Sequence, residues 1–533
     1  MKQTMVVVGG GAMGTGIALV AAQAGLSVTL VEPDPAAHAR IAAAVAKHVA
    51  RASDSAIGMR VTVVAALPSG LDAGLAIEAV PENLELKRAV IGELAAALPS
   101  DALLATNTSS LSVEDIMATV PAPERTLGLH FFNPPTAMRL VEIVPTSQTG
   151  DAQLQRAREY VELFGKTGVE AADTPGFIVN RVARPFYLQA MAALEREVGT
   201  IDDLDALARG AGFAMGPFEL MDFIGLDVNL ATSESIYERT EAARLQPNPL
   251  QRDLIAQGRL GRKSGVGFYD YSTPETSPRG DLPIDAPAES ERNGDEIVAL
   301  LGLASLGDDV FELLTGSFDH VVRIENEDDV SDVSPETTIA IDLGDGASDR
   351  TATVLELDRA LPPDAAIFVD AYATDLKGCL RRMRHPERLV GYGILGSLDR
   401  QRVIEIVDTQ VATQDVLSLA QELFEGFGHA TVLVADDPGL FLGRLIGSIV
   451  NEAVIAVEEE IATPDDIDTA MRLGVNYPLG PIAWGREIGG ARIARILRAL
   501  AKAEGDAFAP SRALWVLDVE GQEQQQLEEA IDA

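Results

Sequence analysis

The stretch MVVVGGGAMGTG at residues 5–16 decides the fold of the first part of this chain. It joins a short apolar run, typical of a buried strand, to a G-x-G-x-x-G pattern that opens a helix-like segment. Gly9 permits the tight turn, Gly11 lets the backbone approach a diphosphate, and Gly14 lets helix and strand pack closely. The sequence therefore predicts a dinucleotide-binding unit, with Met13 in the same loop.

An acidic residue supports this interpretation. Glu32 ends the second strand-like run, 23 positions after Gly9. A carboxylate there can accept hydrogen bonds from the adenosine ribose hydroxyls, and its charge opposes a 2′-phosphate. Amide groups and the dipole at the helix N-terminus would hold the diphosphate. We therefore expect NAD, rather than NADP, as the cofactor.

Apolar runs alternate with helix-like segments over the first 180 residues, which is typical of a parallel sheet built from βαβ units. From Val182 to about Leu260 the pattern is mainly helical. The predicted strands are 5–8, 28–31, 75–80 and 103–106, and the predicted helices are 12–24, 35–51 and 85–98.

The sequence then repeats itself weakly. PERTLGLH (123–130), RLVEIV (139–144) and TPGFIVNR (174–181) recur as PERLVGYG (386–393), RVIEIV (402–407) and DPGLFLGR (437–444), each at an offset of 263 residues. MGPFEL (215–220) and LGPIAW (479–484) match at an offset of 264. So long a period indicates duplication of a whole unit rather than a solenoid.

The predicted fold class is an α/β Rossmann NAD-binding domain plus an all-α C-terminal domain, followed by a degenerate Rossmann-like domain and a second all-α domain. A proline-rich, acidic stretch separates the copies and reads as a linker. The expected domains are 1–181 (Rossmann), 182–271 (helical), 272–296 (linker), 297–435 (degenerate Rossmann-like), 436–517 (second helical) and 518–533 (acidic tail).

Composition narrows the class of protein. The 533 residues carry 81 acidic and 42 basic side chains, a net charge of -39, which argues against nucleic-acid or anionic-membrane partners. This acidity fits either an ordinary solvated surface or adaptation to a salty cytoplasm. The single cysteine, Cys379, excludes an internal disulfide and a cysteine-rich zinc site, and we expect no metal. No apolar stretch reads as a spanning helix and no signal peptide is evident, so a cytoplasmic protein is expected.

Four further segments gather polar residues where strand ends would meet. They are AVPENLELK (79–87), ATNTSSLSV (105–113), GLHFFNPPTAMRLVEIV (128–144) and DTPGFIVNRV (173–182). Together they resemble the 3-hydroxyacyl-CoA dehydrogenase family from about residue 4 to 271, and in degraded form to about 485. The longer architecture is similar to bacterial 3-hydroxyadipyl-CoA and 3-hydroxybutyryl-CoA dehydrogenases. The resemblance implies NAD-dependent, reversible oxidation of an (S)-3-hydroxyacyl-CoA.

That chemistry needs a base for the hydroxyl proton, and His130 suits it because an imidazole titrates near working pH. Glu142, twelve residues later, could fix its tautomer and stabilise the imidazolium. The resemblance assigns these two roles. It also implies that Ser109 and Asn180 bind the substrate hydroxyl and thioester carbonyl, with Ser109 touching the cofactor as well.

The resemblance further places residues along the nicotinamide half of NAD, namely Glu82, Lys87, Asn133 and Lys263. Many family members carry a longer, Lys-rich helical excursion near the CoA. Here the corresponding stretch 51–60 is short, so Lys47, Arg51 and Arg60 are the cations expected to meet the CoA phosphates.

The second copy keeps little of this set. At the 263 offset, Ser109 maps to Tyr372, His130 to Gly393 and Asn180 to Gly443, whereas Glu142 maps to Glu405. No glycine triplet stands in 297–330. We expect this copy to bind no dinucleotide, to be catalytically inert and to serve an intrachain pseudo-dimer, with further homo-oligomer formation left open. Two alternatives remain: a dehydrogenase of a free hydroxy acid or sugar acid (gulonate type), and a non-catalytic, crystallin-like protein.

Overall fold

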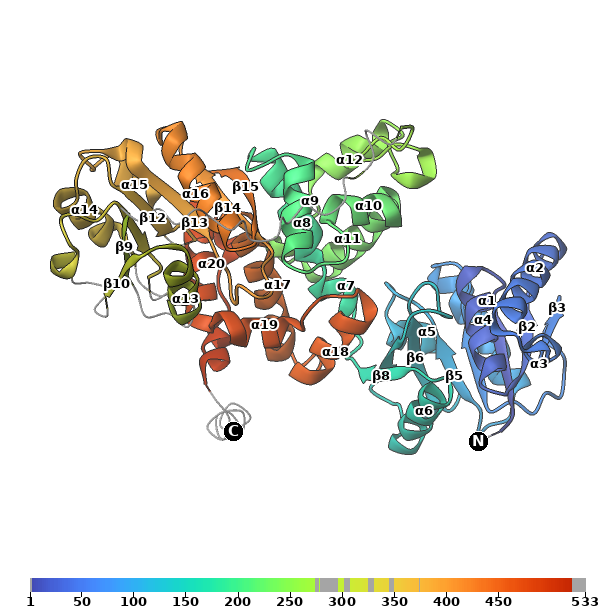
Figure 1. Ribbon diagram of the computed structural model, residues 1–533. Coiled ribbons are helices and arrows are strands. Elements are labelled where there is room, and N and C mark those ends of the chain that lie inside the picture. The colour runs from blue at the N-terminus through green and yellow to red at the C-terminus, as the bar shows by residue number, and fades with distance from the viewer. Residues whose placement is uncertain are drawn as a thin grey trace. The chain divides into compact units, whose positions relative to one another are not determined.

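The computed structural model describes residues 2–273, 278, 296–301, 307–324, 330–344, 349–372 and 374–519. The chain forms two compact units, each built on its own sheet (Figure 1). The first unit is Met1–Val182, Glu238–Thr240 and Ala456–Asn476; the second is Ala183–Tyr237, Glu241–Ile455 and Tyr477–Ala533. Each unit therefore contains segments from both halves of the sequence.

The first unit holds an eight-stranded sheet in the order β3-β2-β1-β4-β5-β6-β7-β8. All neighbours are parallel except β6 and β7, which pair antiparallel. The strands are β1 (Thr4–Val8), β2 (Ser27–Val31), β3 (Val61–Val64), β4 (Leu75–Glu78), β5 (Leu103–Thr106), β6 (Thr126–Phe131), β7 (Leu140–Pro145) and β8 (Thr167–Glu170). The antiparallel pairing places His130 directly opposite Glu142.

Helices cover both faces of this sheet. Side chains from α1, α2 and α6 share one apolar cluster with alternate strand residues such as Val7 and Ile77, as the two-residue period of a strand requires. α4 and α5 contact each other and bury other side chains. The helices are α1 (Ala12–Gln23), α2 (Pro35–Ala52), α3 (Ser55–Met59), α4 (Leu84–Ala97), α5 (Val113–Met117), α6 (Asp151–Leu163), α7 (Val179–Val182) and α18 (Pro464–Gly474).

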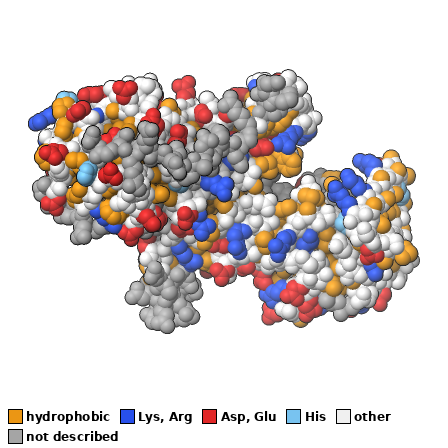
Figure 2. Space-filling view, in the orientation of Figure 1, with side chains coloured by type: hydrophobic (Ala, Val, Ile, Leu, Met, Phe, Trp, Pro, Cys, Tyr) orange, Lys and Arg blue, Asp and Glu red, His pale blue; other side chains and the backbone are white. Residues whose placement is uncertain are grey.

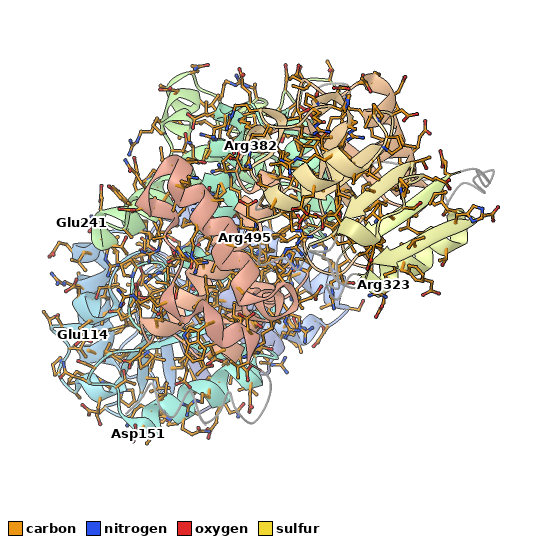
Figure 3. The ribbon with its side chains drawn as sticks, turned by 90° about the vertical axis from the view of Figure 1, so that its left-hand side faces the viewer. Glu114, Asp151, Glu241, Arg323, Arg382 and Arg495 are labelled. Carbon is orange, nitrogen blue, oxygen red and sulfur yellow. The ribbon has the colours of Figure 1, made fainter. Side chains whose placement is uncertain are left out.

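Local chemistry explains where these helices begin. Asp34, Asn83 and Ser112 each cap a helix by accepting a backbone N–H with the side chain. Glu114 and Asp151, labelled in Figure 3, stand in the first turns of α5 and α6, where the helix dipole favours an anion. Every strand and helix predicted in this region is found, with ends within two residues of those expected. The sequence did not individually predict β3, β6, β7, β8, α3, α5 and α6.

The second sheet has seven strands in the order β10-β9-β11-β12-β13-β14-β15, with only β13 and β14 antiparallel. This is the order of the first sheet without a counterpart of β3, which confirms the predicted duplication. Residues 302–306, which follow its first strand, lie outside the described residues. The strands are β9 (Ile297–Leu301), β10 (His320–Ile324), β11 (Ile339–Asp342), β12 (Ala366–Asp370), β13 (Leu389–Gly393), β14 (Val403–Asp408) and β15 (Ala430–Ala435).

The second unit also contains helices from both copies, whereas α18 of the second copy belongs to the first unit. Those from the first copy are α8 (Arg184–Glu195), α9 (Ile201–Gly210), α10 (Pro217–Ile224), α11 (Leu226–Thr240) and α12 (Pro249–Ala256). Those from the second copy are α13 (Gly307–Ser317), α14 (Thr351–Ala360), α15 (Leu376–Leu380), α16 (Gln414–Gly426), α17 (Leu440–Glu458), α19 (Pro481–Ile488) and α20 (Gly490–Glu504).

One of these helices corrects an expectation. The sequence predicted no stretch long and apolar enough to span a membrane, yet α17 meets both criteria by length and composition. Its most apolar window is 89% buried inside the protein, where it packs as a core helix. The sequence did not predict this helix as a candidate because Arg444 and Glu452 interrupt its apolar residues.

The two copies exchange equivalent contacts. In the first unit α18, which belongs to the second copy, packs on β7 and β8, and the Ala172 N–H donates to the Ile461 carbonyl at 2.8 Å. In the second unit α9, from the first copy, packs on β14, and the Ala435 N–H donates to the Val198 carbonyl at 2.9 Å. The two hydrogen bonds are related by the 263-residue offset.

Two predicted segments fall mostly outside the described residues. Of the linker 272–296 the structure describes only 272, 273, 278 and 296, and of the tail 518–533 only 518 and 519. The domain boundaries stay a prediction.

Candidate active site

The glycine loop between β1 and α1 has no room for larger side chains at two positions. Gly9 has φ +107°, and a Cβ atom there would lie 2.5 Å from the Ala79 carbonyl oxygen. A Cβ atom on Gly14 would lie 1.9 Å from the Gly9 carbonyl oxygen. At Gly11, by contrast, no atom lies within 4 Å of that position. The loop is therefore tightly packed against neighbouring backbone at Gly9 and Gly14 and open at Gly11, as the binding of a diphosphate requires.

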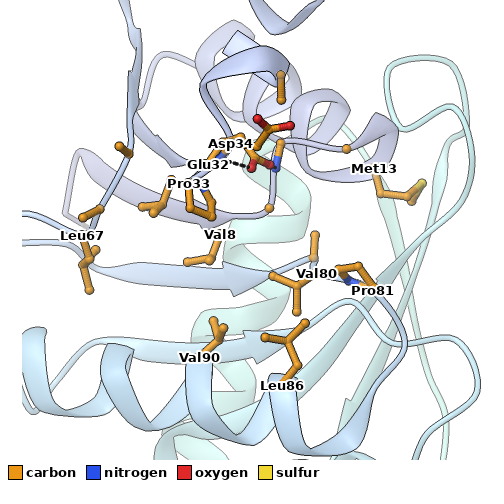
Figure 4. A pocket seen from close by; sticks show the side chains of 18 of the residues that line it. Val8, Met13, Glu32, Pro33, Asp34, Leu67, Val80, Pro81, Leu86 and Val90 are labelled. Atoms are coloured by element: carbon orange, nitrogen blue, oxygen red, sulfur yellow. Dashed lines mark hydrogen bonds between the residues drawn. The ribbon is translucent and has the colours of Figure 1, made fainter.

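A cavity of about 700 Å³ opens beside this loop (Figure 4). Glu32 and Met13 line it, together with apolar residues such as Val80 and Leu86. Glu32 Oε2 accepts the Gly10 N–H at 2.8 Å and Oε1 accepts the Asp34 N–H at 2.9 Å. These bonds fix the carboxylate at the cavity wall, and each oxygen keeps lone pairs for a further donor. The loop, the acid and the apolar walls fit NAD.

We expect Glu32→Ala to weaken NAD binding without affecting the chemical step, because a carboxylate on the cavity wall at the end of β2 would bind the ribose rather than the reacting atoms. A lost charge-assisted hydrogen bond is worth about 1.5–3 kcal/mol, or about 10- to 100-fold in KM for NAD. Steady-state kinetics with NAD and NADP check this. An unchanged KM for NAD would contradict the assignment of the ribose site.

His130 and Glu142 form the central pair of the candidate site. The antiparallel register of β6 and β7 sets them opposite each other, and His130 Nδ1 lies 2.6 Å from Glu142 Oε2. Both side chains are buried, and the rings of Phe132 and Phe177 pack at 4.6 and 5.7 Å from the imidazole. The carboxylate bond to Nδ1 orients the ring and leaves Nε2 for a substrate.

Backbone amides hold the other carboxylate oxygen. Glu142 Oε1 accepts the N–H groups of Ile178 and Val179, at 3.1 and 2.9 Å. Phe177 has φ +48°, a conformation unusual for a large side chain, and it turns the chain so that these amides face β7. Asn180 follows directly in α7 and is half-buried. The same turn therefore anchors the dyad and carries Asn180.

Ser109 joins a second polar group after β5. The Ser109 N–H donates to Glu82 Oε1 at 2.9 Å, and Lys87 Nζ lies 3.4 Å from Glu82. Lys87 is itself 2% exposed and donates to Glu78 Oε1 at 2.9 Å. Glu78, which the sequence did not single out, is fully buried and also accepts a hydrogen bond from the Thr106 hydroxyl. Its signal was an acid ending an otherwise apolar strand.

The predicted CoA cations do not all lie together. Lys47 and Arg51 line a cavity of about 380 Å³, with Asn133 and with Arg40 and His48, which the sequence analysis did not select. Figure 2 shows Lys and Arg side chains gathered over the α1–α2 part of the first unit. Arg60, which directly precedes β3, instead donates to the Ala22 carbonyl.

Lys263, predicted to lie along the nicotinamide half of NAD, belongs to the second unit, where it pairs with Asp227.

The second copy shows how the pocket was lost. The Tyr372 hydroxyl donates to Glu405 Oε2 at 2.8 Å, and Glu405 Oε1 accepts the Phe441 N–H at 2.7 Å. A Cβ atom on Gly393 would lie 3.0 Å from the Tyr372 ring, and one on Gly443 2.7 Å from it. The tyrosine ring thus occupies the space that His130 and Asn180 use in the first copy.

Glu405 gives a pH-dependent prediction. Burial raises its carboxyl pKa from 4.5 to about 7, against the hydrogen bonds from Tyr372 and two backbone amides. Between pH 4.5 and 7 the folded state therefore holds a proton that the unfolded state has lost, so stability falls as pH rises through this window. In Glu405→Gln this fall, up to about 3 kcal/mol, should disappear. Urea unfolding at pH 5 and pH 8 measures it, and an unchanged difference between the two pH values would contradict it.

Within the described residues no group of three or more His, Cys, Asp or Glu side chains could hold a metal ion. Cys379 is buried, which raises its thiol pKa to about 11. A thiol that stays protonated at neutral pH is a weak nucleophile.

Comparison with known proteins identifies the family. The sequence pattern of the 3-hydroxyacyl-CoA dehydrogenase NAD-binding domain matches residues 4–174. That of the 3-hydroxyacyl-CoA dehydrogenase C-terminal domain matches twice, at 176–271 and 439–530. The chain belongs to the 3-hydroxyacyl-CoA dehydrogenase family.

Individual relatives include both long and short proteins. The chain is 35% identical over 512 residues, 93% of each protein, to 3-hydroxyadipyl-CoA dehydrogenase of Escherichia coli K12. The crystal structure of 3-hydroxybutyryl-CoA dehydrogenase from Escherichia coli K12 matches with a TM-score of 0.75 and 32% identity, covering 100% of this chain and 99% of that one. The 3-hydroxybutyryl-CoA dehydrogenase of Bradyrhizobium diazoefficiens is 38% identical over 50% of this chain and 94% of its own length.

Proposed function

We propose that this protein oxidises an (S)-3-hydroxyacyl-CoA to the 3-oxoacyl-CoA, reversibly, with NAD. The observation that carries the proposal is the His130–Glu142 pair, buried and correctly bonded in the same unit as an intact glycine loop. The membership of the 3-hydroxyacyl-CoA dehydrogenase family and the names of the relatives agree with it.

His130 acts as the general base in this proposal. Its Nδ1 is bound to Glu142, so Nε2 takes the proton of the 3-hydroxyl, and the Glu142 carboxylate stabilises the imidazolium that results. The glycine loop and Glu32 would hold NAD, which would supply the acceptor for the hydride on the carbon that bears the hydroxyl. Ser109 and Asn180 donate hydrogen bonds to the substrate oxygens, where negative charge develops. In the reverse direction His130 returns the proton.

The CoA moiety is proposed to bind at the cavity that Lys47 and Arg51 line. Both cations stand on α2 one turn apart, with Arg40 on the same helix. On a chain of net charge -39 such a local group is needed, because the overall field repels an anionic substrate. We do not include Arg60 among the proposed CoA contacts, because its guanidinium donates to the Ala22 carbonyl.

We also propose that the two copies form an intrachain pseudo-dimer. The exchanged hydrogen bonds, Ala172 to Ile461 and Ala435 to Val198, support it because they occupy equivalent positions. The cytoplasm is the proposed compartment, supported by the packed interior position of α17 and by the acidic composition. We propose that the protein binds neither nucleic acid nor a membrane, because its net charge of -39 would repel both polyanions and anionic lipids.

One substrate series tests the function and the CoA contacts together. NADH oxidation is followed with acetoacetyl-CoA, with acetoacetyl-pantetheine, which lacks the nucleotide, and with free acetoacetate. We expect activity with both thioesters, a higher KM for the pantetheine compound and no turnover of the free acid. Full activity with the free acid would favour the hydroxy-acid alternative, and no activity with any of them from pH 6 to 9 would favour the non-catalytic one.

A further inference from the structure

The first unit contains one segment from the second copy, residues 456–476. Its helix α18 contacts β7, β8 and α7, so that residues nearly 300 positions apart lie side by side (Figure 1). The second copy, in which the Tyr372 ring occupies the space that His130 and Asn180 use in the first, thus contributes directly to the unit that holds the candidate active site.

Three specific contacts join this segment to the first copy. Arg181, 3% exposed, pairs with Glu459 at 2.7 Å. The Ala172 N–H donates to the Ile461 carbonyl at 2.8 Å. Gly474 lies so close to the first copy that a Cβ atom there would be 2.8 Å from Leu140 and 3.0 Å from Val179 side-chain atoms. The segment therefore contacts the first copy near its start, at Glu459 and Ile461, and at the end of α18, at Gly474.

Each of these contacts lies beside a part of the candidate site. Leu140 begins β7, the strand of Glu142, and Val179 donates its N–H to that carboxylate. Arg181 follows Asn180 in α7, a helix of only four residues. A single helical turn has no stability of its own, because most helical stability in proteins comes from packing. The position of α7 thus depends on what packs against it.

We infer that residues 459–474 of the second copy are a positioning element for the active site of the first. By holding α7 against β7, they keep the Ile178 and Val179 amides on Glu142 and Asn180 toward the substrate. The inert copy is therefore required for full turnover, although it touches neither substrate nor cofactor. This inference rests on the proposed function.

The second unit supplies a matched control. There Arg196, the counterpart of Glu459 at the 263 offset, pairs with Asp437. Gly210 packs against Val403, as Gly474 packs against Leu140. These contacts join equivalent surfaces, but the carboxylate beyond them, Glu405, faces Tyr372 and no base. Disturbing them affects stability alone.

The test compares Glu459→Ala with Arg196→Ala in the full chain. For Glu459→Ala we expect kcat with acetoacetyl-CoA to fall about 10- to 100-fold, since small displacements of reacting groups cost that much. KM for NADH should change less than about twofold, the pH profile of kcat should shift, and Glu459→Asp should recover most of the activity. For Arg196→Ala, kcat should stay within about twofold of wild type at a comparable loss of thermal stability.

The inference is overturned if Glu459→Ala keeps wild-type kcat, or if both alanine variants lose activity in proportion to stability. Should Glu459→Ala not fold, Gly474→Ala against Gly210→Ala makes the same comparison. An active wild type with unaffected variants refutes this inference alone, whereas an inactive wild type refutes the proposed function.

Discussion

Replacing His130 by Gln should reduce kcat by about 10²- to 10⁴-fold, the range that general-base catalysis contributes. Glutamine keeps a hydrogen-bonding side chain of similar reach but cannot take a proton at neutral pH. The position lies in β6 between the rings of Phe132 and Phe177, so the change should not disturb the glycine loop. Stopped-flow and steady-state assays with acetoacetyl-CoA and NADH measure the loss.

Binding of NADH provides the control for this variant. Its affinity, followed by fluorescence, should stay within about twofold of wild type, because His130 does not line the cavity beside Glu32. Retention of more than a tenth of wild-type kcat would show that another group takes the proton and would refute the assignment of His130.

Replacing Glu142 by Gln should cost about 10³- to 10⁴-fold in kcat, the scale of the analogous change in a catalytic triad, although the shape is nearly conserved. The amide oxygen would remain with the Ile178 and Val179 amides, which need an acceptor. The NH₂ group would then face Nδ1, so Nδ1 would have to accept and Nε2 would carry the proton. That is the wrong tautomer for a base, the reason that the analogous carboxylate-to-amide change disables a serine-protease triad.

Glu405→Gln is the matched control, because Glu405 has the same amide partners in the second copy but faces Tyr372 instead of a histidine. We expect unchanged kcat and KM. A loss of more than about fivefold in Glu405→Gln, or a Glu142→Gln variant with near wild-type kcat, would contradict the division into one active and one inert copy.

The sequence predicted the elements around the glycine loop well, because their signals are local. Gly9 and Gly14 lie where a Cβ atom would collide with backbone, so the pattern reflects steric need. His130 and Glu142, only twelve residues apart, lie on adjacent strands, and their pairing follows from an antiparallel register. Glu78 was missed because an acid that ends an apolar strand is only a weak signal, since the sequence does not show whether its side chain is buried.

The sequence by itself determined the fold class, the duplication, the intact glycine loop and the loss of the histidine and asparagine from the second copy, because residue identity and spacing carry that information. The tertiary structure alone decided that Arg60 lies apart from Lys47 and Arg51, that the Tyr372 ring fills the second pocket, and that α18 packs against α7. These facts depend on which surfaces meet. Contacts between residues 33 or 38 positions apart, like those between residues hundreds of positions apart, leave no local pattern.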